Sequence, residues 1–319
     1  MSKNENIEDI IILGSGPAGY SAAVYAARGG VEPLLLTGMT VGGQLTTTTT
    51  IENWPGGGLE LTGDKLVDDM KQHAIDVGTR IEYDMVVSVD FSEQPYRLIG
   101  DSGKTYLTKS LIIATGAYAK LLGIESEEKF YGRGVSACAT CDGFFYKNKE
   151  VAVIGGGNTA VEEAIYLSNI ASKVNLVVRK DFFRCENILK LRLQEKEKEG
   201  KIVVHFNSQV DEILGDNRGV NALRIKNNQS DELTIISLDG VFIAIGHQPN
   251  TSLFENKLDL EFGYIKVKGG DHHGQTETSV KGVFAAGDVS DSIYRQAITS
   301  AGTGCKAALD AIAYLEGVK

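Results

Sequence analysis

The sequence is poor in several residues and patterns that mark particular classes of protein. Of its 319 residues only 5 are proline, 4 are cysteine and 1 is tryptophan. Four cysteines in a chain of this length do not make a disulfide-stabilised secreted scaffold, so a reducing compartment is the more natural setting. No apolar run approaches the roughly 18 residues that a membrane helix requires. The N-terminus, from Met1 to Asp9, is polar and acidic, unlike a secretory signal.

Positive charge is also in short supply. Lysine and arginine total 32 against 42 acidic residues, which gives a formal net charge of -10 and a pI near 5.1. No basic stripe stands out that could neutralise phosphates, so nucleic acid is not expected as the main partner. We expect an acidic, soluble, cytoplasmic protein with two domains, each large enough to bury its own core.

Glycine, in contrast, is abundant, with 37 residues. A first glycine turn follows a short buried-strand run at residues 10–13 and leads into an alanine-rich helical stretch through Ala27. A strand, a glycine turn and a helix in this order let the backbone approach a pyrophosphate, which binds at the helix N-terminus. The turn comprises Gly14, Ser15, Gly16, Pro17, Ala18 and Gly19.

The segments after this first turn depart from the simplest nucleotide-binding pattern. The strand at residues 34–36 runs into Thr37 and Gly38, without the acid that usually binds the ribose. Something else must therefore help to hold the dinucleotide. The stretch from Gly42 to Gly56, which includes a threonine run at 46–50, is interpreted as a long ligand-facing loop, although such loops are often only surface connections.

A helix pattern and further strands follow. Helical spacing of apolar residues is expected between residues 62 and 77, with His73 on the helix face rather than among ligands. Strand-like runs occur at residues 85–91 and 96–99. Another buried strand, at residues 111–116, ends in small residues that let the chain pass close to a nucleotide.

A second glycine turn repeats the first, between a strand at residues 151–154 and a helix that continues through Leu167. A chain with two such units is expected to hold two dinucleotides. The next strand ends in Arg179 and Lys180, with Arg184 close behind, and cations there suit the 2′-phosphate of NADP. A solvated basic patch is the alternative. This turn comprises Gly155, Gly156, Gly157, Asn158, Thr159 and Ala160.

The two units resemble an internal repeat, because each glycine turn is followed further along the chain by a strand that ends in small residues. These strands lie at residues 111–116 and 242–246. A third segment, residues 283–288, ends in Asp288, an acid well placed to hold a sugar-like hydroxyl chain. We therefore expect the chain to return to the first domain there.

Cys138 and Cys141 are separated by two residues and followed by Asp142. Such a pair can close a small, reducible disulfide, and its thiolate form attacks other disulfides. The adjacent acid can shuttle a proton, although a helix-cap or turn role is also open. A zinc site would need two more ligands at short spacing, but the chain offers only Cys185, Cys305 and five scattered histidines.

We therefore expect redox chemistry at Cys138 and Cys141, and unpaired structural thiols at Cys185 and Cys305. His272 and His273 are too few for a metal site, so no metal is expected. Together the motifs resemble those of bacterial-type, low-molecular-weight thioredoxin reductases, over nearly the whole chain. The matching segments are Gly14 to Gly19, Gly42 to Leu45, Glu52 to Gly56, Ala137 to Phe145, Gly155 to Ala160, Gly246-His247, Gly287-Asp288 and Arg295 to Gly302.

The resemblance implies an α/β fold with two Rossmann-like domains. The FAD-binding domain would be discontinuous, residues 1–117 and 248–319, and the NADPH-binding domain, residues 118–247, would carry the cysteine pair. For FAD it implies the first turn together with Thr37, Gly38, Gly42, Gly43, Gln44, Leu45, Asn53, Thr115, Gly116, Gly287, Asp288, Arg295, Gln296 and Ala297. For NADPH it implies Gly155, Gly157, Asn158, Thr159, Ala160, Arg179, Lys180, Arg184 and Gly246.

The sequence departs from the family at the basic segment, because Val178-Arg179-Lys180 stands where members usually show His-Arg-Arg. An ammonium replaces a bidentate guanidinium, so the preference for NADPH is expected to weaken without reversing.

The resemblance also implies a mechanism and partners. NADPH would give a hydride to the flavin, which would open the disulfide, and the dithiol would then reduce oxidised thioredoxin. Cys141 would face the flavin, Cys138 would attack the partner, and Asp142 would act as acid and base. Arg133, Phe144 and Phe145 would help to dock thioredoxin, although paired phenylalanines are more often core residues. The enzyme would be a homodimer.

The order of the motifs suggests a movement. The disulfide and the nicotinamide belong to one domain, both must reach one flavin, and the dithiol must then reach a protein. A rotation about the crossings near residues 117–120 and 247–249 is therefore expected. Two alternatives stay open: a related flavoprotein serving a peroxidase or glutaredoxin-like protein, and a flavin-binding redox sensor. The first usually requires an appended thioredoxin-like domain, and a sensor has little use for a hydride donor.

Overall fold

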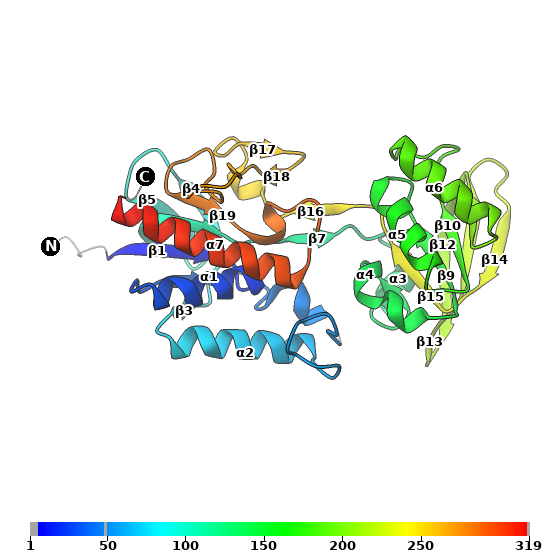
Figure 1. Cartoon of the computed structure of the whole chain (residues 1–319), viewed down its shortest axis with the longest axis horizontal. Helices are drawn as coiled ribbons and strands as arrows, with labels where there is room; N and C mark the ends of the chain where they lie inside the picture. The colour runs from blue at the N-terminus through cyan, green and yellow to red at the C-terminus, as the bar shows by residue number, and fades with distance from the viewer. Residues whose placement is uncertain (1–5, 48–49, 318–319) are drawn as a thin grey trace. The chain divides into compact units, whose positions relative to one another are not determined.

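The computed structural model describes residues 6–47 and 50–317, so Thr48 and Thr49 of the threonine run lie outside the described residues (Figure 1). The chain folds into two compact units. The first combines Met1–Tyr118 with Gln248–Lys319, and the second, Ala119–His247, is inserted in it. This is the discontinuous α/β arrangement that the sequence predicts.

The first unit is built on a sheet whose strand order is β3-β2-β1-β6-β5-β4, with β19 also paired to β6. β1, β2, β3, β6 and β19 run parallel, and β5 and β4 complete the sheet antiparallel. The strands are β1 (Ile7–Leu13), β2 (Leu34–Leu36), β3 (Arg80–Glu82), β4 (Val86–Asp90), β5 (Tyr96–Gly100), β6 (Thr105–Ile113) and β19 (Val283–Ala285).

Three α-helices occur among the described residues of this unit, and they lie alongside one another in Figure 1. They are α1 (Pro17–Arg28), α2 (Gly63–Asp76) and α7 (Ala297–Glu316). The sequence explains their starts: Pro17 fits the first turn of α1, and Thr62 caps α2 by accepting a hydrogen bond from the amide of Lys65. Shorter elements are η1 (Gly43–Thr47), η3 (Ser252–Phe254), η4 (Gly287–Val289), β17 (Leu260–Glu261) and β18 (Tyr264–Ile265).

The central strand β1 is buried on both faces, as expected for a parallel strand with layers above and below it. Its Ile10 and Ile12 pack with α1 and α7, whereas Ile11 and Leu13 pack with β4, β5 and η3. The near-continuous apolar run Ile10-Ile11-Ile12-Leu13 therefore serves two hydrophobic cores. The same run positions the glycine turn at the carboxyl end of the strand.

The second unit has a five-stranded parallel sheet in the order β11-β10-β9-β15-β8, and a three-stranded antiparallel sheet in the order β12-β13-β14. The strands are β8 (Val135–Ser136), β9 (Glu150–Ile154), β10 (Lys173–Val177), β11 (Ile202–His205), β12 (Ser208–Asp216), β13 (Gly219–Asn227), β14 (Leu233–Ser237) and β15 (Gly240–Ile243). The helices are α3 (Glu125–Phe130), α4 (Ala139–Asp142), η2 (Gly143–Tyr146), α5 (Asn158–Ser168) and α6 (Asn187–Lys198).

Alternation along β9 again divides the core. Val151 and Val153 face the layer that contains α5 and α6, and Ala152 and Ile154 face the antiparallel sheet. The sequence predicts β9, α5, β10 and β15 of this part, but not β8, β11, α6 or the antiparallel sheet.

The chain crosses between the units at β7 (Ala117–Ala119) and β16 (His247–Pro249), which pair as a two-stranded sheet. Within residues 6–47 and 50–317, no helix is long and apolar enough to span a bilayer.

The packing of α7 on α1 depends on a glycine. A β-carbon at Gly304 would lie 2.1 Å from the carbonyl oxygen of Ala18, whereas one at Gly302 in the same helix would meet nothing within 4 Å. Gly304 is therefore a close-contact position, and Gly302 is an open helix position.

We expect Gly304→Ala to lower the free energy of unfolding by about 1–3 kcal/mol, because the added methyl group forces the helices apart. Gly302→Ala is the matched control and should be neutral or stabilising by up to about 1 kcal/mol. Urea unfolding of both variants at one FAD concentration measures the difference. Equal stability of the two variants would contradict the close contact.

Candidate active site

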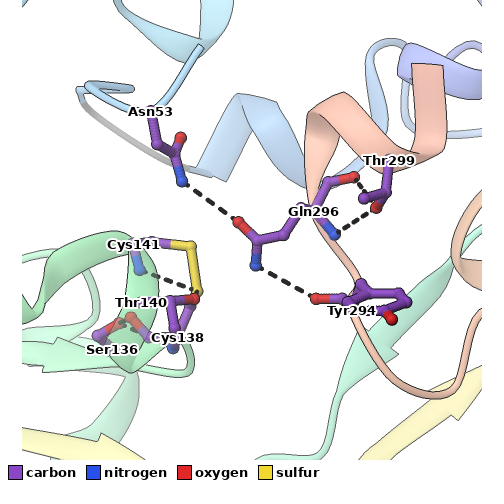
Figure 2. The surroundings of a disulfide bond; sticks show 8 residues. All are labelled: Asn53, Ser136, Cys138, Thr140, Cys141, Tyr294, Gln296 and Thr299. Atoms are coloured by element: carbon purple, nitrogen blue, oxygen red, sulfur yellow. Dashed lines mark hydrogen bonds between the residues drawn. A yellow bond between two sulfur atoms is a disulfide. The ribbon is translucent and has the colours of Figure 1, made fainter. Parts of the chain in front are cut away.

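Cys138 and Cys141 form a disulfide, with their Cα atoms 5.3 Å apart (Figure 2). Cys138 is the N-cap residue of α4, and Cys141 lies within that helix. Ala139 between them is fully buried in the core beside α5 and anchors the short helix. The two sulfur-bearing residues are only partly buried. The disulfide is thus held by the core but remains accessible.

Backbone and side-chain donors surround Cys138. The amide of Cys141 donates to the sulfur of Cys138 over 3.2 Å, and the hydroxyl of Thr140 lies 3.4 Å from the same sulfur. The amide of Cys138 donates to Ser136 Oγ at 3.0 Å. A sulfur that accepts an amide hydrogen bond at a helix start is favoured as a thiolate. After reduction, negative charge is therefore stabilised better on Cys138 than on a free cysteine.

Asp142 follows directly in α4 and is partly buried. Burial raises the pKa of its carboxyl above the ordinary value, although a hydrogen bond with Ser136 partly offsets this effect. Burial, with the nearby Asp142 charge, also raises the pKa of Tyr146 to about 12. A carboxyl that holds its proton more firmly than usual, next to a cysteine pair, is suited to deliver and retrieve a proton.

The residues around the cysteine pair form an exposed surface. Phe144 and Phe145 are 65% and 44% exposed, and Arg133 is also exposed. The alternative that this phenylalanine pair belongs to the core is therefore wrong. Exposed aromatic rings next to a reactive disulfide are more typical of a contact surface than of an interior.

The first glycine turn is fixed by two backbone contacts. A β-carbon at Gly14 would lie 2.2 Å from the carbonyl oxygen of Ala114, and one at Gly19 would lie 1.9 Å from that of Gly14. At Gly16, by contrast, the nearest atom would be 4.0 Å away. Gly14 and Gly19 thus bring β1, β6 and α1 together, and Gly16 leaves the space at the start of α1 open.

Ser15 joins this turn to the next segments. Its hydroxyl donates to the carbonyl of Thr37 at 3.0 Å and accepts from the amide of Gly42 at 3.1 Å. Gly43, Gln44 and Leu45 follow in η1 rather than in the irregular loop that the sequence suggests. The N-terminus of α1 has no side-chain cap, so its amides can receive a phosphate.

Asp288 fits a polyhydroxyl ligand. Its carboxyl is partly buried, burial raises its pKa, and Ser300 donates to Oδ1 at 2.8 Å. Within the described part of the chain no group donates to its other oxygen. The amide of the preceding Gly287 donates to Thr303 Oγ1 at 2.9 Å, so α7 holds the turn in place. A partly buried carboxylate with acceptor capacity to spare favours hydroxyl donors such as those of a sugar-alcohol chain.

The segment before α7 is held by a single carboxylate. Asp291 accepts from the amides of Ile293, Tyr294 and Arg295 at 2.8, 2.9 and 3.2 Å. Arg295 has φ +48°, a left-handed conformation that this side chain rarely adopts. The three bonds therefore stabilise a bend that would otherwise be unfavourable.

Gln296 follows that bend and begins α7 as part of a capping box with Thr299. Its side chain donates to the carbonyl of Tyr294 at 3.3 Å and accepts from Asn53 at 3.2 Å, as Figure 2 shows. The predicted residues Asn53 and Gln296, far apart in the sequence, are thus brought together. Asn250 similarly joins Thr115 and Gly116 through three hydrogen bonds of 2.8 to 3.0 Å.

The second glycine turn has the same backbone contact as the first. A β-carbon at Gly155 would lie 2.3 Å from the carbonyl oxygen of Ala244, and one at Gly156 would lie 2.8 Å from the Val178 side chain. Gly157 has nothing within 4 Å and begins α5 without a side-chain cap. This turn, too, leaves open space and helix amides without a side-chain cap, which suit a phosphate.

The other residues predicted around this turn are placed as follows. Thr159 and buried Ala160 lie in the first turn of α5, and Asn158 Oδ1 accepts from the amide of Glu186 at 3.0 Å. Arg179, Lys180 and Arg184 are exposed. Gly246 lies by the crossing, where its carbonyl accepts from the amide of Lys120.

Sequence reasoning gave no role to Asn250, Asp291 or Ser300, which hold predicted residues. Asp291 could have been found, because an aspartate just before several loop residues often accepts their amides. Ser300 lies in the matched segment Arg295 to Gly302, but nothing in that segment points to its contact with Asp288. Asn250 had no local signal. Cys185 and Cys305 are free, as expected. Among residues 6–47 and 50–317, no group of three or more His, Cys, Asp or Glu residues could hold a metal ion.

A reducible disulfide in one unit and two nucleotide-type glycine turns define a nucleotide-dependent disulfide oxidoreductase. The family model for the pyridine nucleotide-disulphide oxidoreductases matches residues 8–304 of the sequence. The chain belongs to this family, which implies FAD and NADPH as cofactors, and the residues of both turns fit such groups.

Individual relatives refine the assignment. The chain is 59% identical to a thioredoxin reductase of Escherichia coli O157:H7 over 97% of this chain and 96% of the relative. A solved thioredoxin reductase from Giardia duodenalis has a TM-score of 0.91 and 37% identity, covering 98% of this chain and 100% of that one. The resemblance to thioredoxin reductases and the predicted fold class are confirmed.

One relative has a different name. A glucosaminate ammonia-lyase of Pseudomonas fluorescens is 60% identical over 97% of this chain and 96% of its own length. Relatives of nearly equal identity thus carry different activity names. Overall identity therefore shows the family, and the residues of the site are the better guide to the activity.

The raised pKa of Asp142 has a consequence for stability. Below the ordinary aspartate pKa of 3.8 the carboxyl is protonated in both folded and unfolded chains and has no effect. As the pH rises from 3.8 to the raised folded pKa, the unfolded chain ionises before the folded one, so the stability falls, and the loss is complete above the folded pKa. Asp142→Asn should therefore stabilise the oxidised protein by about 1 kcal/mol at neutral pH and by progressively less in acid.

Urea unfolding over a pH series measures this effect, with Asp216→Asn as the sign control. Hydrogen bonds from the amide and side chain of Arg218 lower the pKa of Asp216. That control should destabilise the protein at neutral pH and lose its effect in acid. If Asp142→Asn raised the free energy of unfolding equally at every pH, the raised pKa of the Asp142 carboxyl would be contradicted.

Proposed function

We propose that this protein is an NADPH-dependent flavoprotein that reduces oxidised thioredoxin through the disulfide of Cys138 and Cys141. The observation that carries the proposal is this partly exposed disulfide, whose Cys138 sulfur accepts the amide of Cys141, beside a carboxyl of raised pKa. The 59% identity to a thioredoxin reductase over 97% of the chain supports the same substrate.

The cofactor assignments follow the two glycine turns. We assign FAD to the first unit, with its pyrophosphate at the start of α1 and its hydroxyl chain at Asp288. The Asn53–Gln296 pair and the Arg295 bend would hold the remaining contacts. We assign NADPH to the second unit, at the start of α5 and the cations beyond β10. When bound, these two groups supply a hydride transfer that delivers two electrons to the disulfide.

The exchange with thioredoxin follows from the hydrogen bonds at the cysteine pair. In the dithiol form, the thiolate of Cys138 attacks one sulfur of the substrate disulfide and releases the other as a thiolate. Cys141 then attacks Cys138, reforms the disulfide and releases the second substrate sulfur. The substrate gains two electrons and two protons, and the enzyme loses the same number. The amide of Cys141 stabilises the negative charge on Cys138 before the attack.

Asp142 is proposed as the proton carrier of this exchange. Its raised pKa lets the buried carboxyl carry a proton to a departing substrate thiolate. It directly follows Cys141 in α4.

Arg133, Phe144 and Phe145 are proposed to contact thioredoxin. Their exposure next to the disulfide supports this role. A homodimer and a cytoplasmic location are proposed from the family resemblance and from the two free cysteines, respectively. Sedimentation equilibrium tests the first proposal, and cell fractionation tests the second.

Domain rotation is proposed because one flavin must exchange electrons with both the nicotinamide and the disulfide. The chain passes between the units only at β7 and β16, so few backbone torsions need to change. A disulfide engineered between the two units should reduce thioredoxin turnover by at least about tenfold, since hinge motion then becomes impossible. The measurement is turnover before and after selective reduction of the crosslink, and full activity of the locked form would refute the rotation.

The central test is an anaerobic titration of the FAD-loaded protein. NADPH should bleach the flavin of the wild type, Cys138→Ser and Cys141→Ser, because the flavin site lies outside the pair. Only the wild type should then reduce thioredoxin, with each variant losing at least about a thousandfold, as for a residue that forms a covalent intermediate. Cys305→Ser is the control and should retain full turnover. Bleaching without thioredoxin reduction by the wild type would reject the substrate but not the cofactors.

A second experiment tests the activity named for the Pseudomonas relative, the release of ammonia from glucosaminate. Elimination of ammonia from glucosaminate requires no net electron transfer, so a reducible disulfide would have no role in it. We expect no ammonia release from glucosaminate by the same preparation. Release that persists in Cys138→Ser would mean that this fold carries a second, redox-independent activity.

A further inference from the structure

The basic segment after β10 is fixed in place by contacts that the family motif does not include. Arg179, Lys180 and Arg184 are exposed, and within the described ranges no carboxylate lies within ion-pair distance of their side chains. Unpaired neighbouring cations repel one another, so this arrangement favours a bound anion.

The backbone of this segment is held at each carbonyl. The carbonyl of Val178 accepts from the amide of Ser208 at 3.0 Å, and the carbonyl of Lys180 accepts from the amide of Asn207 at 3.1 Å. The carbonyl of Arg179 accepts instead from a side chain, Nδ2 of Asn228, at 2.9 Å. Asn228 lies just after β13, 49 residues further along the chain. Its own amide donates to the carbonyl of Asn207 at 2.7 Å, so one asparagine joins both neighbouring loops.

The side chain of Lys180 is held separately. Its Nζ lies 4.9 Å from the centre of the Phe182 ring, a cation–π contact. Phe182 is itself 51% exposed, so packing in the core does not explain its presence. A lysine is a flexible point charge, whereas the arginine usual at this position is a preorganised fork. The ring reduces the freedom of the ammonium and so compensates in part for the replacement.

Arg184 is connected to the glycine turn itself. Its amide donates to the carbonyl of Gly156 at 2.7 Å, so the third cation moves with the turn that precedes α5. The three cations therefore have three different supports: Asn228 for Arg179, Phe182 for Lys180, and Gly156 for Arg184.

We propose that Asn228 and Phe182 are positioning residues that set the preference of this site for a 2′-phosphorylated nucleotide. They act through Arg179 and Lys180 and need not touch the coenzyme. The inference rests on the proposed assignment of the second glycine turn to NADPH. It predicts that changing either residue affects recognition of the 2′-phosphate and leaves recognition of the rest of the nucleotide intact.

The test uses two probes that contain only the adenosine half of the coenzyme, adenosine 2′,5′-bisphosphate and adenosine 5′-monophosphate. Calorimetric titration of the full-length FAD-loaded protein gives the ratio of their dissociation constants. Asn228→Ala should weaken binding of the bisphosphate by about threefold to tenfold, which is the worth of one hydrogen bond. Phe182→Leu should weaken it by about twofold to fivefold. Affinity for the monophosphate should stay unchanged in both variants.

The controls separate positioning from general damage. Asn221→Ala removes another exposed asparagine from the same strand region, β13, and should leave the ratio at the wild-type value. Phe182→Tyr keeps an aromatic face for Lys180 and should also match the wild type. The ratio of KM for NADH to that for NADPH should fall in Asn228→Ala and Phe182→Leu, with kcat for NADPH retained.

The outcomes distinguish a failure of this inference from a failure of the assignment of NADPH to the second unit. If the wild type does not prefer the bisphosphate, the assignment of NADPH to the second unit is wrong. If the wild type prefers it and both variants keep its ratio, Asn228 and Phe182 have no role in specificity. Tighter bisphosphate binding by Phe182→Leu would mean that the ring withdraws Lys180 from the site, and would also overturn the proposal.

Discussion

A single backbone contact, made once in each unit, determines the geometry of both proposed nucleotide sites. The first glycine of each turn lies against the carbonyl of an alanine at the end of a neighbouring strand: Gly14 against Ala114, and Gly155 against Ala244. Because no side chain fits there, the turn and the strand end approach closely enough to aim the following helix at one place. The third residue of each turn, Gly16 or Gly157, then leaves room in front of that helix. The repeat visible in the sequence is thus a repeat of one steric requirement.

Local patterns predicted most of the parallel part of the fold. The runs at residues 10–13 and 151–154 became β1 and β9, and the helix expected near residues 62–77 became α2. These patterns succeed because buried strands and glycine turns depend mainly on their own residues. The antiparallel sheet β12-β13-β14 was not predicted. Its outer strand β14 alternates only weakly between buried and exposed positions.

The residues proposed to bind a ligand carry a signal in the sequence, whereas the residues that hold them in place do not. Cys138, Cys141 and the glycine turns are visible because their spacing itself carries the chemistry. Asn228 had no such signal, because its role depends on a carbonyl 49 residues away in the chain. Asn250 was missed for the same reason, and so was the contact of Ser300 with Asp288. Supporting residues of this kind depend on tertiary structure, and a single sequence does not contain that information in a local form.

The pairing of β7 with β16 has a consequence for how such a chain can be divided. Since paired strands lie about 5 Å apart, the point where the chain leaves the first unit and the point where it returns are neighbours. An insert with adjacent ends adds almost nothing to the loop-closure entropy of its host. A tight reverse turn in place of residues 119–247 would leave the host sheet continuous. The excised segment would be a self-contained module whose own ends could be joined into a ring.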